Sequence, residues 1–111
     1  MTSDLNAAYV AQIRAAGVLI DLLATAADQG LPGAAWMVTG GGTVVGHCLG
    51  ATDVQRRASF EAWADLVGAR RLPDEIAPLW TVELRARVVD LRACQVDVVA
   101  WLDEPFGGEY Q

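Results

Sequence analysis

Apolar residues recur every three or four positions between residues 4 and 29, which is the period of an amphipathic helix. The stripe that we expect to face the core consists of Leu5, Tyr9, Ile13, Ala16, Ile20, Leu23 and Ala27, with Leu19 and Leu22 beside it. Gly30 then supplies the left-handed residue that commonly ends a helix, and Pro32 follows as a stop. We therefore predict a helix over residues 4–29 whose stripe packs on the rest of the domain.

A glycine cluster at residues 40–42 separates two β-prone runs. Such a cluster is typical of a turn, since glycine adopts positive φ without steric cost. The pattern predicts a hairpin over residues 34–49. It leaves open which side of the returning strand is buried: Val45, His47 and Leu49, or Val44, Gly46 and Cys48.

A capping box indicates a second helix from residue 53 onward. Thr52 and Gln55 have the spacing at which each side chain bonds to the backbone N–H of the other residue. The apolar stripe that follows consists of Phe60, Trp63, Ala64 and Val67. Gly68 is expected to end the helix, and we predict that the proline-containing residues 70–79 form a linker without regular structure.

The period changes to two in residues 80–102. Even-numbered residues in 80–88 and 94–102 are mostly apolar, whereas the odd-numbered ones include most of the charges. This alternation predicts an antiparallel hairpin with one buried face.

The register of this hairpin follows from parity. Because both apolar sets are even-numbered, paired residues must sum to an even number, or one face would mix core with solvent. A sum of 184 sets Arg87 opposite Asp97 and pairs Asp90 with Cys94 around a three-residue loop. A sum of 182 sets Arg85 opposite Asp97 instead. Both registers place an arginine against that aspartate.

The predicted elements follow in the order α-β-β-α-β-β. Two apolar helix faces are covered most simply by one apolar sheet face. We therefore predict an α+β fold in which a four-stranded antiparallel sheet carries both helices on one face. We expect residues 1–103 to form a single domain and residues 104–111 to form an acidic, flexible tail.

Composition narrows the classes of partner. All eight cationic residues are arginine, and the net charge is −6. Such a chain should repel nucleic acid and anionic lipid, and its apolar runs are shorter than the roughly 18 residues that span a bilayer. Two cysteines are too few for a disulfide framework. The N-terminal residues do not show the basic region and apolar run of a signal peptide. We expect a cytoplasmic protein with no membrane or nucleic-acid partner.

Candidate catalytic chemistry is sparse. His47 and Cys48 are adjacent, but neighbouring strand residues point to opposite faces and cannot easily act together. Cys48 and Cys94 fit small buried hydrophobes better than nucleophiles, and a single histidine does not fit a multi-histidine metal site. We therefore assign no catalytic, cofactor-binding or metal-ligating residue and expect no cofactor.

The polar side of the second hairpin is a candidate interaction surface. Arg85 and Arg87 lie on this side, together with Val99 and Trp101 from the returning strand. A tryptophan beside arginines is typical of the few residues that dominate the energy of protein–protein binding. The same pattern also fits a solvated sheet face with cross-strand ion pairs, or a face that the linker and the tail fold over, and all three interpretations stay open at this point.

Three segments resemble small uncharacterised acidic proteins encoded in streptomycete genomes. They are Trp36-Met-Val38, then Arg56-Arg57-Ala-Ser-Phe60-Glu-Ala-Trp63, and the strand from Val96 to Leu102. The resemblance implies a bacterial, actinobacterial protein with an α+β fold, and it implies no activity.

Together these patterns favour a non-enzymatic interaction or accessory module that forms a homodimer or binds another protein. One alternative is a small-molecule binder or minor enzyme with a pocket between sheet and helices, where Tyr9, His47 or an arginine would converge. Another alternative is an acidic regulator that binds a basic partner through residues 104–111.

Overall fold

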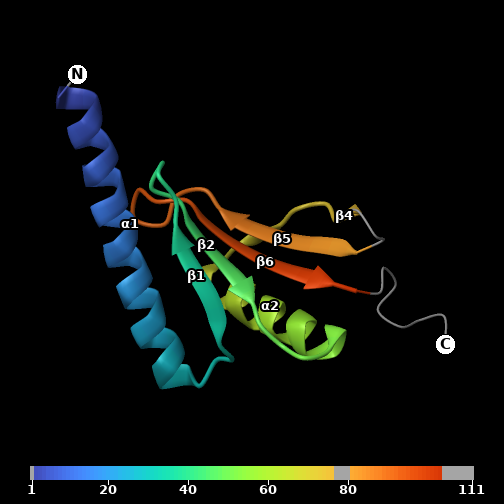
Figure 1. The fold of residues 1–111 in the computed structure, drawn as a ribbon. Helices are drawn as coiled ribbons and strands as arrows, with labels where there is room; N and C mark the ends of the chain where they lie inside the picture. Colours follow the sequence, from blue (N-terminus) through green and yellow to red (C-terminus); the bar gives the residue numbers. More distant parts are fainter. Residues whose placement is uncertain (1, 77–80, 104–111) are drawn as a thin grey trace.

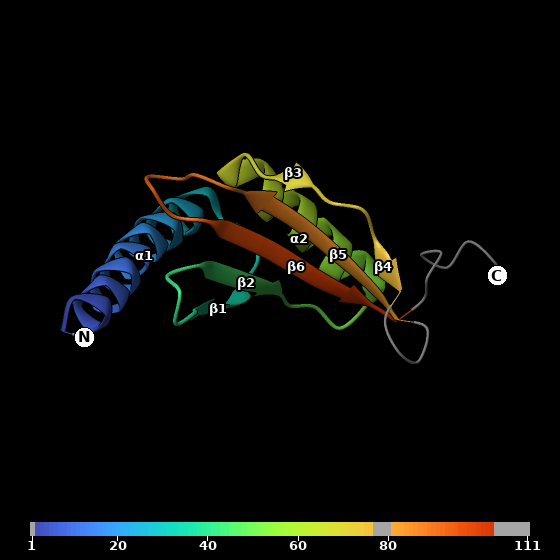
Figure 2. The same cartoon turned by 90° about the horizontal axis from the view of Figure 1, so that it is seen from above.

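Two helices and a single mixed sheet make up the structure, a computed structural model that describes residues 2–76 and 81–103. The elements are α1 (Thr2–Gln29), β1 (Ala34–Val38), β2 (Val44–Cys48), α2 (Asp53–Val67), β3 (Arg70–Arg71), β4 (Glu75–Ile76), β5 (Val82–Val88) and β6 (Val96–Leu102). Figures 1 and 2 show α2 lying across the sheet and α1 beside the β1–β2 hairpin. The predicted α+β class is confirmed.

The sheet differs from the prediction in its topology. Its strand order is β1-β2-β6-β5-β3, with β4 paired to the other end of β5, and β2 runs parallel to β6. The predicted four-stranded, wholly antiparallel sheet is therefore wrong. A parallel pair needs a long crossover between its strands, and the segment that contains α2, β3, β4 and β5 supplies it.

The predicted linker at residues 70–79 is also wrong in part, because β3 and β4 lie inside it. Arg70 pairs with Arg87, and Glu75 pairs with Glu83, both antiparallel. The outer edge of β5 would otherwise leave backbone N–H and C=O groups without partners. Two short strands satisfy part of that edge, and Pro73 separates them.

Both predicted hairpins form. In the first, Gly42 has a φ of +83° and its N–H donates to the Thr39 carbonyl at 3.0 Å, as the glycine cluster predicts. In the second, the residue numbers of every pair from Val82–Leu102 to Val88–Val96 sum to 184, so Arg87 lies opposite Asp97.

The tip of the second hairpin departs from the predicted three-residue loop. Leu91 and Cys94, rather than Asp90 and Cys94, exchange backbone hydrogen bonds of 2.8 and 3.1 Å. The two residues between them, Arg92 and Ala93, both have positive φ, the geometry of a tight hairpin turn. This pair no longer sums to 184, so β5 carries one extra residue between Val88 and Leu91.

The core lies between the even-numbered side of the strands and the two helices. It contains Phe60 and Trp63 from α2, Ala15, Val18 and Ala26 from α1, and Val44, Cys48, Leu84, Val98 and Leu102 from the sheet. The question left open for β2 is thereby answered, since its even-numbered residues face the helices.

The side of α1 that faces the core is not the predicted one. Ala15, Val18 and Ala26 are buried, whereas the predicted stripe through Ile13 and Ile20 is exposed. Helix α1 is apolar on both sides, so periodicity alone could not choose between them. The side with small residues fits close packing: a Cβ at Gly42 would lie only 2.7 Å from the Ala11 Cβ.

Helix α1 is long and apolar in composition. An 18-residue window within residues 5–29 has a mean hydropathy of 1.5, and by length and composition alone the helix could cross a membrane. The same test is passed by core helices of soluble proteins and by signal sequences near an N-terminus, and one side of α1 is packed in the core here.

Gly46 of β2 is expected to tolerate no larger side chain while Trp36 is present. The two residues are register partners, and a Cβ at Gly46 would lie 2.6 Å from the Trp36 ring. The ring has little room to move, since it makes an edge contact with Trp63 at 4.9 Å. We expect Gly46→Ala to lower the free energy of unfolding by about 1–3 kcal/mol in a denaturant titration.

The Trp36→Leu background supplies the control for this prediction. Removing the ring removes the clash, so Gly46→Ala should cost at least about 1 kcal/mol less in that background. An equal cost in both backgrounds would show that the contact with Trp36 is not the reason that glycine is required.

Candidate functional site

The odd-numbered side of the central strands is the face that the helices leave uncovered. Cross-strand pairing places Asp97 beside Arg87, Val99 beside Arg85, and Trp101 beside Glu83. Strand β2 extends two of these rows, with Val45 next to Asp97 and His47 next to Val99. We call this side of β2, β5 and β6 the open face.

A buried carboxylate fixes two arginines on the open face. Asp97 is only 2% exposed. Arg87 donates to it from Nε at 2.8 Å and from Nη2 at 2.9 Å, and Arg85 donates from Nη1 at 2.6 Å. Arg85 also donates from Nε to Glu83 at 2.6 Å, and the Gln95 amide donates to Asp97 at 3.2 Å. These charge-assisted bonds hold both guanidinium groups in one orientation.

The charge on Asp97 is maintained by its partners. Burial by itself raises the pKa of the Asp97 carboxyl, but the hydrogen bonds from Arg87 and Arg85 outweigh it and hold that pKa below its ordinary value. The hydrogen bond to Asp97 likewise raises the pKa of Arg87. All three groups are therefore charged at neutral pH.

The four predicted surface residues lie together on the open face, but they are not equally accessible. Arg85 and Arg87 are half-buried, and Trp101 is 41% exposed. Val99 has no exposed surface and forms the floor between its neighbours. A partner could therefore reach Trp101 and the outer edges of the two guanidinium groups, but not Val99.

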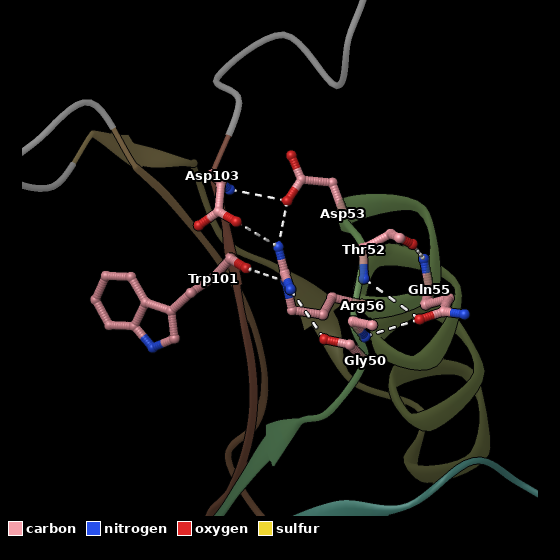
Figure 3. Close-up of polar contacts among 8 residues, drawn as sticks. Gly50, Thr52, Asp53, Gln55, Arg56, Trp101 and Asp103 are labelled. Atoms are coloured by element: carbon pink, nitrogen blue, oxygen red, sulfur yellow. Dashed lines mark hydrogen bonds and ion pairs between the residues drawn. The ribbon is translucent and has the colours of Figure 1, made fainter.

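A polar cluster around Arg56 of α2 holds the strand end that carries Trp101 (Figure 3). Arg56 Nε donates to the Trp101 carbonyl at 2.7 Å, and Nη1 donates to the Gly50 carbonyl at 2.9 Å. Its Nη2 contacts both Asp53 and Asp103, and the Asp103 N–H donates to Asp53 at 2.9 Å. In Figure 3 the indole points away from α2 and from this cluster.

The role of Arg56 was not predicted from the sequence. Trp101 and Asp103 lie 45 and 47 residues away along the chain, so no local spacing signals the contact. The capping box beside it was predicted and is present, with Thr52 Oγ1 accepting from the Gln55 N–H at 3.1 Å. The box and Arg56 together fix the start of α2 against the end of β6.

No protein-family model, curated protein or solved structure matches the chain. The resemblance to streptomycete proteins and the cytoplasmic location therefore stay predictions. Conclusions about the site rest on its geometry.

The two thiols lie inside the protein. Cys48 and Cys94 are free and buried, and burial raises the pKa of both thiols, which weakens them as nucleophiles at neutral pH. Cys48 faces the helices, whereas His47 lies on the open face, as strand alternation predicts. Within the part of the chain that the structure describes, no three His, Cys, Asp or Glu side chains could jointly hold a metal ion.

Proposed function

We propose that this protein is a non-enzymatic interaction module that recognises another protein through its open face. One observation carries the proposal: a partly exposed tryptophan lies diagonally beside Arg85 and on the same face as Arg87, and a buried aspartate holds both arginines in place. Tryptophan and arginine are enriched among the residues that dominate binding energy. The partner that fits has an apolar group opposite Trp101 and a carboxylate opposite Arg85 and Arg87.

Preorganisation supports this role. Side chains that are already ordered lose little conformational entropy on binding. Among the hydrogen bonds of the described residues, Arg85 uses Nε and Nη1 and Arg87 uses Nε and Nη2. Since a guanidinium has five N–H donors, both arginines keep donors for a partner's carboxylate.

The alternatives have no comparable observation in their favour. Tyr9 is exposed on the outer side of α1 and His47 lies on the open face, so these two candidate ligands do not converge between sheet and helices. The acidic tail invoked for a basic partner, residues 104–111, lies outside the described residues.

Site-specific photo-crosslinking tests the proposed surface. A photoreactive amino acid replaces Trp101 in the full chain, which is then irradiated inside the producing cells. The matched control position is Val54 on α2, which is 75% exposed. We expect defined crosslinked protein products from position 101 that position 54 does not give.

Affinity then tests the role of the indole. For a partner identified in this way, Trp101→Ala should weaken binding by about 30-fold, since a central tryptophan commonly contributes about 2 kcal/mol. Val54→Ala should leave affinity unchanged. Equal crosslinking from both positions, or unaltered affinity in Trp101→Ala, would exclude the open face as the recognition surface.

A further inference from the structure

The outer side of α1 carries an apolar stripe that the rest of the chain does not cover. Its members, all exposed, are Leu5, Tyr9, Ile13, Ala16, Ile20, Leu23 and Ala27. Ile13 is 71% exposed and Ile20 is 65% exposed. Figures 1 and 2 show α1 at one end of the molecule, with the other described elements all on one side of it.

The stripe contains no charge. The charged residues in the middle of the helix, Arg14 and Asp21, lie to its side, towards the β5–β6 hairpin. Asp21 accepts a hydrogen bond from Arg92 in the hairpin loop at 2.5 Å. Burial raises the pKa of the Cys94 thiol, and Arg14 is close enough for its charge to offset part of that rise. Contiguous apolar surface of this extent is uncommon on a monomer and marks contact sites.

We propose that the stripe binds the same stripe of a second copy of this chain, with the two α1 helices antiparallel. From Tyr9 to Ala27 the spacing of the stripe is 4-3-4-3-4, the seven-residue repeat with which helices pack lengthwise on one another. Over these residues the contact would be about 27 Å long. A two-fold axis makes this single surface complementary to itself.

The antiparallel orientation follows from the sizes of the side chains. When paired residues sum to 36, Tyr9 meets Ala27 of the second copy, and Ala16 meets Ile20. The remaining layer pairs Ile13 with Leu23, so that large side chains face small ones or one another without hollows. A parallel, in-register pair would instead stack Ala16 on Ala16 and Tyr9 on Tyr9, which alternates gaps with crowding.

The centre of the antiparallel pairing also permits a close approach. Gly17 lies at the level of the two-fold axis on the flank of the stripe, and apart from its chain neighbours and the backbone of α1 no atom of the described chain is within 4 Å of its Cβ position. At roughly 100 Å² for each of the four large side chains in the pairing and roughly half that for each of its two alanines, the stripe would hide about 500 Å² per copy and about 1,000 Å² in the pair. That total is the lower limit for specific interfaces, so we expect a dissociation constant in the micromolar range.

A membrane is the less favoured occupant of the stripe. Crossing a bilayer would require α1 to leave the sheet, where Ala15, Val18 and Ala26 are buried. Helices that lie on a bilayer surface typically carry several basic residues, whereas the sequence of α1 has one, Arg14, against three aspartates.

Sedimentation equilibrium of the full chain tests the dimer. Across micromolar concentrations the mass should rise from 11.8 kDa towards twice that value. The double variant Ile13→Glu, Ile20→Glu should weaken association at least about 10-fold, since it puts charges into an apolar seam. Val54→Glu, an equally exposed valine on α2, is the matched control and should associate like the unmodified chain.

Engineered cysteines test the orientation. Because Cys48 and Cys94 are buried, added surface thiols should react first. A mixture of the Tyr9→Cys and Ala27→Cys chains should form a mixed disulfide, while Tyr9→Cys alone should not link to itself. Ready self-linking of Tyr9→Cys would overturn the antiparallel pairing. A monomer at every concentration, with or without binding to lipid vesicles, would overturn the dimer altogether.

Discussion

Replacing Trp63 with alanine is expected to lower the free energy of unfolding by about 3–5 kcal/mol. The side chain is buried in the centre of the core and makes the edge contact with Trp36. Its Nε1–H also donates to the Pro32 carbonyl at 2.8 Å, which ties the α1–β1 connection to α2. Truncation removes this packing and also leaves that carbonyl without its donor. Chemical denaturation measures the loss.

Trp101→Ala is the matched control for this substitution. It removes the same atoms from the open face, where the indole is partly in water and only its backbone carbonyl is held by Arg56. We expect a loss below about 1 kcal/mol. Similar losses at both positions would contradict the assignment of Trp63 as a central residue of the core.

Local patterns predicted the local features of the fold. The capping box places Thr52 at the start of α2 because its two bonds form between residues three apart. Parity restricted the second hairpin to two registers, and the structure has the one that sets Arg87 opposite Asp97. A strand's alternation reports its buried face directly, because its two sides differ in composition.

The features that escaped prediction depend on contacts between distant segments. Helix α1 is apolar on both sides, so the choice of buried side follows from how closely the β1–β2 turn at Gly42 approaches it. The parallel pairing of β2 with β6 joins residues about fifty positions apart, and no spacing in the sequence reports it. The tight turn after Leu91 has two residues with positive φ, Arg92 and Ala93, neither of which is a glycine.

The sequence predicted which residues lie on the candidate surface but not how deeply each of them is buried. Odd-numbered positions correctly placed Arg85, Arg87 and Trp101 on one face. Alternation says which side a residue faces but not how far its neighbours cover it, and Val99 is covered completely. Each register considered from the sequence set one arginine opposite Asp97. In the structure Arg87 is opposite Asp97, and Arg85 also reaches it from the diagonal position.

Replacing Asp97 with asparagine is expected to lower the free energy of unfolding by about 2–3 kcal/mol at neutral pH. Breaking a fully buried ion pair costs about 3–5 kcal/mol, and the partly exposed arginines recover some of this through water. The matched control is Asp74→Asn, which removes a 2.7 Å contact with Arg71 at the surface. That change should cost less than about 0.5 kcal/mol. Equal losses in the two variants would show that burial adds nothing to the Asp97 cluster.

The difference in stability between the unmodified chain and Asp97→Asn should depend on pH in one direction. The pKa of Asp97 is lower in the folded chain than in the unfolded chain, where an aspartate titrates near about 3.9. The folded state therefore binds fewer protons in this range, and the contribution of the carboxylate is complete above the unfolded value. It should shrink as the pH falls below about 4 and vanish once the pH passes the folded value. Denaturant titrations of both chains at pH 7 and at successively lower pH measure the difference. A difference that grew on acidification would mean that burial, not the two arginines, controls the charge on Asp97.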